Sequence, residues 1–162
     1  MSNELVFRIT ALEEALAAGL EDLLVLHWEE VAQDHRDAPL APDWPKYRHL
    51  ARAGVLTVFG AWRGVRLVGY NVFFVQPTLH HANTLWALND LLYLEPEERL
   101  GSAGIRLVSF AETELAKRGV KKVLYQPNII AHFGRGKARG TVGDLLAKLG
   151  YRHVENVYAK GL

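Results

Sequence analysis

The sequence predicts an α/β protein with a mixed central sheet and helices on both faces of that sheet. Between residues 55 and 94, runs rich in β-branched and aromatic residues follow one another with only turns between them, which is typical of an antiparallel meander. After residue 94, helical spacing alternates with strand-like runs, which favours parallel strands joined through helices. The sheet should therefore be antiparallel in its N-terminal part and parallel in its centre.

Composition limits the classes of protein to which the chain can belong. Its 162 residues, 49% of them hydrophobic, suit one domain, which we expect to span residues 1–162. Nineteen Lys and Arg against 18 Asp and Glu give no overall attraction to nucleic acid or to an anionic membrane. The absence of cysteine excludes a disulfide framework, a thiolate zinc site and a cysteine nucleophile. An acidic N-terminal stretch and the lack of a long apolar run predict a cytoplasmic protein with no membrane partner.

The N-terminal segment predicts a short strand followed by a helix. Residues 6–9 are extended in pattern, and Thr10 with Glu13 forms a T-x-x-E capping box. Apolar residues, with His27 among their positions, then recur at helical spacing as far as Val31. Because glycine weakens a helix, Gly19 is expected to divide this segment in two.

The next segment predicts a loop, a short helix and a hairpin. Three prolines in residues 37–45 require a loop, and residues 47–52 suit one short helix. The runs 55–62 and 66–75 are typical of two strands joined by a turn at Arg63 and Gly64.

The third strand and the helix after it occupy residues 84–118. We expect a turn over 77–83, a strand over 84–94 that Pro96 ends, and a helix over 101–118 that Gly119 ends.

The remainder of the chain predicts a strand over 120–126, a loop over 127–140 and a helix over 142–149 that Gly150 ends. A last strand is expected over 151–160. Since the strands 84–94 and 120–126 are joined through a helix, they should be parallel, with a right-handed crossover.

The turn before the helix at 101–118 has the features of an anion site. Gly101 and Gly104 leave the first backbone N–H groups of that helix unobstructed, and these groups lie at the positive end of the helix dipole. Arg99 adds a charged donor beside them. A pyrophosphate could bind here, although glycine is also common in any turn between a strand and a helix.

Asp90 to Leu94, followed by Pro96, Arg99, Gly101 and Gly104, resembles motif A of the GCN5-related N-acetyltransferases. The loop of that family is usually Q/R-x-x-G-x-G/A. Either Glu98 replaces its first residue, or Arg99 with glycines two and five positions later gives a variant spacing. The strands over 55–70 and the segment 145–160 resemble the family as well, and His80 and His81 together with Asp90 resemble its phage and prophage branch.

The resemblance implies that the chain binds acetyl-coenzyme A. Pantetheine would lie along Leu92, Tyr93 and Leu94, where the parallel strands splay apart. Asn128 matches the family's N-x-x-A and would also contact the coenzyme. The pyrophosphate would lie on the turn made by Arg99, Leu100, Gly101, Ser102, Ala103, Gly104 and Ile105.

The resemblance also implies direct attack by a neutral amine on the acetyl group, with no covalent enzyme intermediate. An unpaired charge is costly in an apolar strand, so Asp90 must be hydrogen-bonded or face a cleft, and a proton acceptor is one role open to it. The other catalytic candidates are His81 and Tyr93, and the expected acceptor contacts are Trp44, His81 and Asp90. No metal site is expected.

The acid that protonates the leaving thiolate is open at this point. Family members often use a tyrosine four residues before the glycine that ends the last helix, and this sequence has Leu146 there. Tyr93, Tyr125 or solvent could take that role.

The acceptor and the oligomeric state are equally open. Small amines, peptide termini, lysines and nucleotide sugars all suit such a protein, and a homodimer is compatible with it. The alternative is a non-catalytic module of the same fold that contacts a host protein or, less expected, nucleic acid through the basic runs 117–122 and 134–140.

Overall fold

The computed structural model describes residues 4–31, 39–99, 101–127, 132–133 and 140–160. Its main sheet has five strands in the order β1-β2-β3-β4-β5, and neighbouring strands are antiparallel except for the parallel pair β4 and β5. This confirms the mixed sheet expected from the sequence. The strands are β1 (Leu5–Thr10), β2 (Leu56–Arg63), β3 (Arg66–Thr78), β4 (His81–Leu94) and β5 (Lys122–Leu124).

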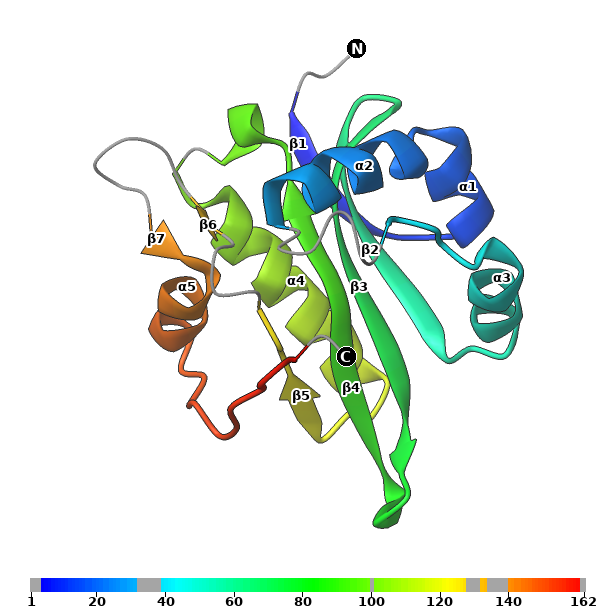
Figure 1. Cartoon of the computed structure of the whole chain (residues 1–162), viewed down its shortest axis with the longest axis vertical. Coiled ribbons are helices and arrows are strands. Elements are labelled where there is room, and N and C mark those ends of the chain that lie inside the picture. Colours follow the sequence, from blue (N-terminus) through cyan, green and yellow to red (C-terminus); the bar gives the residue numbers. More distant parts are fainter. Residues whose placement is uncertain (1–3, 32–38, 100, 128–131, 134–139, 161–162) are drawn as a thin grey trace.

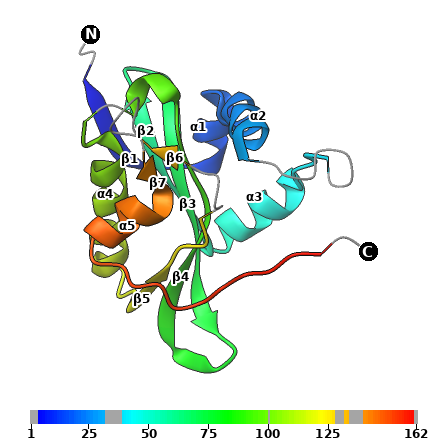
Figure 2. The same cartoon turned by 60° about the vertical axis from the view of Figure 1, so that its left-hand side comes forward.

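Helices cover both faces of this sheet (Figures 1 and 2). One face carries α1 (Leu12–Ala17), α2 (Leu20–Val31) and α3 (Trp44–Arg52), and the other carries α4 (Ala103–Lys117) and α5 (Val142–Lys148). The remaining elements are a 3-10 turn, η1 (Pro96–Glu98), and a small pair of strands, β6 (His132–Phe133) and β7 (Gly140–Thr141).

The strand β3 lies in the middle of the sheet and is buried on both faces. Because successive side chains of a strand point to opposite faces, Tyr70 and Val72 pack on the side of α1 and α2, whereas Phe73 and Val75 pack on the side of α4. A hydrophobic core therefore lies on each face of the sheet, and a residue near the end of β4 can face either core.

A bulge in β4 changes which face its residues meet. Val72 pairs with Leu91 and Phe73 pairs with Asn89, so Asp90 has no partner residue on β3. On its other edge β4 pairs with β5 only over Trp86–Leu88. Among the described residues, no strand pairs with that edge of β4 over 89–94, and this opening is the expected splay of the parallel strands.

The glycines mark the turns as the sequence predicts. Gly19, Gly64, Gly119 and Gly150 all have positive φ, which L residues with side chains rarely adopt. Gly19 separates α1 from α2, as expected, and none of the helices in the described part of the chain has the length and apolarity needed to cross a membrane.

The predicted capping box at Thr10 and Glu13 is wrong. The first helix begins after Ala11 and has no side-chain cap, because the hydroxyl of Thr10 is buried at the end of β1 and accepts a hydrogen bond from Trp62 Nε1 at 3.1 Å. Glu13 instead forms an ion pair with Arg48 on α3.

Two boundaries also differ from the expected ones. The helix α3 begins at Trp44 inside the predicted loop, because Asp43 caps it and Pro45 suits a first helical turn. The strands β3 and β4 continue almost to the tip of their hairpin, because Pro77 lies beside a register shift where its missing N–H is tolerated.

The expected strands near the C-terminus are shorter or absent. Only Lys122–Leu124 of the predicted strand 120–126 pairs with the sheet. Residues 151–160 form no strand, because they cross the end of the sheet instead of running beside β5, and a strand pattern needs a partner to become a strand (Figure 2).

Candidate functional site

A pocket opens at the C-terminal end of β4, between α2 on one side and α4 with α5 on the other; its empty space, open solvent at the mouth included, is about 640 Å³. It lies along the edge of β4 where β5 has ended, and its walls are mainly apolar. The residues that line it are His27, Glu30, Val31, Leu92, Tyr93, Leu94, Arg99, Gly101, Gly104, Ile105, Leu107, Val142 and Leu145.

One end of this pocket is the turn that leads into α4. Gly101 has φ +61°, and a Cβ on Gly104 would come within 3.1 Å of Leu145 Cδ1, so glycine suits both positions. The first N–H groups of α4, which begins at Ala103, have no acceptor within the helix. The turn can therefore hold an anion, as its sequence predicts.

The same turn is held against the β2–β3 hairpin by two ion pairs. Arg63 donates to Glu98 at 2.8 Å, and Arg66 donates to Glu95 at 2.6 Å. Hydrogen bonding from Arg63 lowers the pKa of Glu98. Because Glu98 pairs with Arg63 while Arg99, Gly101 and Gly104 line the pocket, the structure favours the variant spacing over the one that begins at Glu98.

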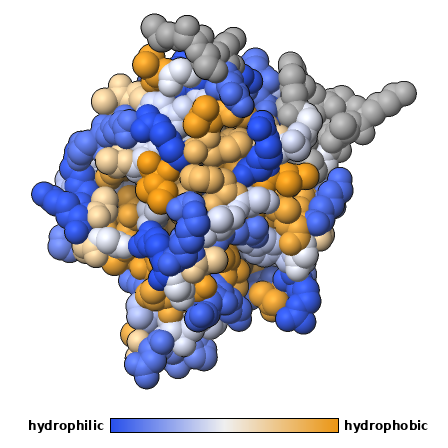
Figure 3. All heavy atoms as spheres, turned by 180° about the vertical axis from the view of Figure 1, so that it is seen from behind, coloured by the Kyte–Doolittle hydropathy of each residue, from blue (hydrophilic) through white to orange (hydrophobic). Residues whose placement is uncertain are grey.

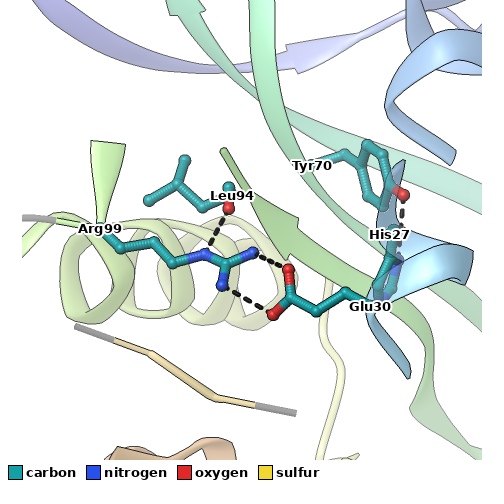
Figure 4. A network of polar contacts seen from close by, with 5 residues as sticks. All are labelled: His27, Glu30, Tyr70, Leu94 and Arg99. Atoms are coloured by element: carbon teal, nitrogen blue, oxygen red, sulfur yellow. Dashed lines mark hydrogen bonds and ion pairs between the residues drawn. The ribbon is translucent and has the colours of Figure 1, made fainter. Parts of the chain in front are cut away.

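Arg99 reaches across the pocket to α2 (Figure 4). Its two terminal nitrogens donate to the carboxylate of Glu30 at 2.7 and 2.6 Å, and its Nε donates to the carbonyl of Leu94 at 2.6 Å. The Arg99 side chain is only 12% exposed, so this bidentate pair is shielded from water. Sequence reasoning missed Glu30, because it lies 69 positions from Arg99 and no local motif marks it.

His27 forms the wall of the pocket beside Tyr93. Their rings stack with centroids 5.0 Å apart, and His27 Nδ1 is hydrogen-bonded to the hydroxyl of Tyr70 at 3.0 Å. Burial lowers the pKa of His27 to about 4, so the ring is neutral at physiological pH. The sequence signal for this residue was a histidine at an apolar position of a helix.

Asp90 projects from the bulge of β4 toward α3. Its carboxylate accepts a hydrogen bond from the hydroxyl of Tyr47 at 2.8 Å. Burial of the carboxyl group raises the pKa of Asp90, and the bond from Tyr47 lowers it. Burial also raises the pKa of Tyr47, which therefore keeps its proton.

A second, smaller pocket of about 290 Å³ lies on this face of the sheet. Trp44 and Tyr47 line it, with ring centroids 5.4 Å apart, and Trp44 Nε1 donates to Glu21 at 3.1 Å. Leu91, next to Asp90, belongs to its wall, whereas Leu92 belongs to the first pocket. The second pocket is therefore lined from the α1–α3 face alone, whereas the first is lined by helices from both faces at the end of β4.

A buried chain of amides lies on the α4 side of the bulge. Asn89 Nδ2 donates to the carbonyls of Val72 and Leu91 and to Asn71 Oδ1, at 2.9 to 3.0 Å. Since a carbonyl can only accept, these contacts fix the orientation of both amides. Asn71 Nδ2 therefore donates to the hydroxyl of Tyr125 at 2.8 Å, and the proton of that hydroxyl is left to be donated elsewhere.

The structure does not bring every predicted residue to the site. His81 lies at the start of β4 and stacks on Trp86 at 4.9 Å. It is nine residues from Asp90, which in a strand is about 30 Å, so the structure does not bring His81 and Asp90 together. Leu100, Asn128 and the basic residues 134–139 lie outside the described residues.

The remaining predicted residues take different places. Tyr93 is enclosed between His27 and Arg99, whose guanidinium lies 5.1 Å from its ring centre. Ser102 precedes α4 without capping it, and Leu146 is buried in α5. Within the described segments, no three metal-binding side chains lie together.

Comparison with solved structures identifies the fold. An aminoglycoside acetyltransferase from an uncultured soil metagenomic sample matches 98% of this chain and 99% of its own, with TM-score 0.70 and 15% identity. The ribosomal-protein-alanine N-acetyltransferase of Brucella melitensis biovar Abortus 2308 matches 98% of each chain, with TM-score 0.70 and 18% identity. The chain has an acetyltransferase fold.

A predicted acetyltransferase with acetyl-CoA from Clostridium acetobutylicum has the same fold, with TM-score 0.67 and 11% identity over 98% of this chain and 96% of that one. No protein-family model and no curated protein sequence matches the chain. None of these three structures supports the resemblance to the phage and prophage branch that His80, His81 and Asp90 suggested.

Proposed function

We propose that this protein is an N-acetyltransferase that transfers the acetyl group of acetyl-coenzyme A to a primary amine. The observation that carries the proposal is the first pocket, where an open edge of β4 over 89–94 meets an anion-binding turn at the start of α4. The acetyltransferase fold, which extends over nearly the whole chain, supports it.

The residues of the pocket fit a coenzyme with a diphosphate and an amide-containing arm. The N–H groups at the start of α4, together with Arg99, suit the diphosphate. The main-chain groups of β4 beyond Leu88 suit the amides of the arm, because an extended chain can pair with an open strand edge. Apolar side chains such as Ile105 and Leu145 suit the carbon atoms between those amides.

Arg99 must leave its present hydrogen-bond partners before it can bind the diphosphate. Its guanidinium is occupied by Glu30 and by the carbonyl of Leu94, so a diphosphate competes with the carboxylate of Glu30 for the same donors. Glu30 therefore holds Arg99 beside the pocket and at the same time opposes binding of an anion there.

Bound acetyl-coenzyme A supplies an activated acetyl thioester, and the protein has to manage two protons. As the N–C bond forms and the C–S bond breaks, the amine loses a proton and the sulfur needs one. Asp90 is the proton acceptor in this scheme, because it lies at the bulge, is exposed, and accepts a hydrogen bond from Tyr47 alone among the described residues.

Tyr125 is the proton donor. Its hydroxyl accepts from Asn71, which leaves its own proton free for the sulfur, and burial raises the pKa of Tyr125, so that proton is present at neutral pH. Tyr125 follows β5 directly, on the α4 side of the opening between β4 and β5. Tyr125 therefore protonates the leaving thiolate, which Leu146 cannot do because its side chain carries no acidic proton.

The acceptor amine approaches Asp90 from its exposed side, beside α3. Tyr47 borders this position, and Asp90 provides a negative charge that attracts a protonated amine before it is deprotonated.

Binding of the coenzyme can be tested with two matched variants. Gly101 and Gly64 have φ of +61° and +59°, and a Cβ added at either position meets no atom within 4 Å. Gly101→Glu and Gly64→Glu therefore impose equal backbone strain, but only the first places a carboxylate in the turn. We expect acetyl-coenzyme A to raise the melting temperature of the wild type and of Gly64→Glu, and not that of Gly101→Glu.

Activity is then measured by release of free thiol across a panel of amines. The chain has no cysteine and gives no background in a thiol assay. No shift with the coenzyme, or an equal shift in both variants, would remove the coenzyme from this pocket. A normal shift with no thiol release across small amines, peptides and amino sugars would favour the non-catalytic alternative.

A further inference from the structure

Asn71, in the middle of β3, is a polar side chain that is wholly buried. It is 0% exposed, and the other buried polar side chains in the described part of the chain are those of Thr10 and Thr57. Thr10 accepts a hydrogen bond from Trp62, and Thr57 accepts one from Arg118. Figure 3 shows hydrophilic side chains spread over the outside of the molecule, where asparagine is usually found. A fully buried asparagine in the central strand therefore needs an explanation.

The bulge of β4 does not require Asn71. Asn89 Nδ2 already donates to the carbonyls of Val72 on β3 and Leu91 on β4, both at 3.0 Å, so Asn89 joins the two strands at the bulge by itself. Asn71 adds a link from Asn89 to Tyr125. Its Oδ1 accepts from Asn89 at 2.9 Å, and its Nδ2 donates to the hydroxyl of Tyr125 at 2.8 Å.

Packing holds the ring of Tyr125 without help from Asn71. The ring lies edge-on to Phe73 and to Tyr151, with centroids 5.3 and 5.4 Å apart. Asn71 is paired across the sheet with Leu92, which lines the first pocket, so the hydroxyl that Asn71 contacts lies close to the part of β4 that borders this pocket. Asn71 therefore sets the direction of the O–H bond and not the place of the ring.

The main-chain carbonyls at the bulge determine that direction. Because a carbonyl oxygen can only accept, Asn89 must turn its NH₂ group toward them, and Asn71 must then turn its own NH₂ group toward Tyr125. An N–H of Asn71 already points at the phenol oxygen, so the proton of Tyr125 points away from Asn71. Burial raises the pKa of Tyr125, and the hydrogen bond from Asn71 lowers it because the N–H stabilises the phenolate.

We propose that Asn71 and Asn89 are positioning residues through which the bulge of β4 directs the proton of Tyr125 toward the sulfur of the coenzyme. This rests on the proposed function. The bulge then serves both proton transfers, since it carries Asp90 itself and reaches Tyr125 through the two amides. When the C–S bond breaks, its electron pair stays on sulfur and takes the proton of Tyr125, which gives a free thiol. The remaining phenolate takes a proton from water before the next cycle.

The direction of the hydroxyl can be measured without any substrate. The C–O stretching frequency of a phenol falls when its oxygen accepts a hydrogen bond and rises when that bond is lost. In infrared spectra the band of Tyr125 is the one that disappears in Tyr125→Phe. We expect this band to rise in Asn71→Leu, which removes the donor at nearly the same side-chain size, and to stay in place in Asn83→Leu, the same change at an exposed asparagine. An unmoved band in Asn71→Leu overturns the proposal.

Kinetics test whether this direction matters for acetyl transfer. Asn71→Leu should lower kcat about tenfold with little change in KM, because it alters a proton transfer and leaves the coenzyme pocket intact. Asn71→Asp adds a pH signature. A protonated carboxyl donates to Tyr125 as the amide does, whereas an ionised carboxylate accepts the proton of Tyr125 and withholds it from sulfur. Relative to the wild type, kcat of Asn71→Asp should therefore fall at least tenfold between about pH 5.5 and about pH 9.

Two kinds of failure are distinguishable. A wild type that releases thiol while Asn71→Leu keeps its full kcat and Asn71→Asp shows a constant ratio over pH rejects the positioning role and leaves the proposed function standing. A wild type that binds the coenzyme and releases no thiol with any amine rejects the proposed function, and the positioning role with it.

Discussion

Replacement of Tyr47 by Phe tests the electrostatics of the bulge. The substitution removes the hydroxyl that donates to Asp90 at 2.8 Å and keeps the ring that packs on Trp44. A hydrogen bond to a charged group contributes about 1.5–3 kcal/mol when it is well buried. Asp90 is exposed as a residue although its carboxyl group is partly enclosed, so solvent screening reduces this contribution to about 1 kcal/mol.

The expected effect is a rise in the pKa of Asp90. The hydrogen bond from Tyr47 stabilises the ionised carboxylate, so its loss favours the protonated form. About 1 kcal/mol corresponds to a rise of about 0.7 pH unit. If Asp90 is the proton acceptor, the acid limb of the pH–rate profile moves to higher pH by the same amount.

The pKa can be measured without knowledge of the acceptor. The ¹³Cγ chemical shift of Asp90 is followed against pH in the wild type, in Tyr47→Phe and in a control variant, Tyr158→Phe. The control removes a hydroxyl from a tyrosine that is exposed to solvent. We expect the pKa to rise in Tyr47→Phe alone. An unchanged or lowered value would refute the bond between Tyr47 and the ionised carboxylate.

Four further outcomes are expected. Asp90→Asn should raise the melting temperature at pH 7 and abolish thiol release, because a carboxyl whose pKa is raised on folding destabilises the fold above its unfolded pKa. Burial lowers the pKa of His27 to about 4, so between pH 6.5 and 4 the unfolded chain binds a proton that the folded chain does not. The free energy of unfolding therefore falls by about 3 kcal/mol as the pH drops through that window. Denaturant titrations should show a smaller loss in His27→Gln. Glu30→Gln should tighten binding of acetyl-coenzyme A about threefold to fivefold in calorimetry, because it removes the carboxylate that competes for Arg99. Tyr125→Phe should lower kcat about 100-fold with little change in KM, and a KM effect alone would assign it a structural role.

Local signals in the sequence were enough for the framework of the fold. Runs rich in β-branched and aromatic residues predicted β2, β3 and β4, and the glycines at 19, 64, 119 and 150 predicted where elements end. Gly101 and Gly104 predicted a turn at the start of α4, where Gly101 has a positive φ and Gly104 lies close to Leu145.

Features that depend on distant partners could not be predicted in this way. In the sequence Glu30 looks like any helical glutamate, and only folding places it against Arg99. Thr10 matches a capping box, but its hydroxyl is hydrogen-bonded to Trp62, which lies 52 residues away. His81 is a candidate because a histidine in a turn can act as a base or contact a substrate, but an extended strand separates it from Asp90.

The predicted strand over residues 151–160 is absent for a related reason. Its residues have a strand pattern, yet a strand exists only where a second strand supplies hydrogen bonds, and no described segment of the same chain does so. Sequence periodicity therefore predicted the capacity to pair without identifying the partner.

A crystal structure of the protein soaked in acetyl-coenzyme A would show whether the open edge of β4 and the turn before α4 together hold the coenzyme. We expect main-chain hydrogen bonds from β4 residues 89–94 to the pantetheine amides, with Arg99 turned from Glu30 to the diphosphate. Coenzyme bound elsewhere, or an empty pocket with Arg99 still paired to Glu30 at saturating concentration, would contradict it.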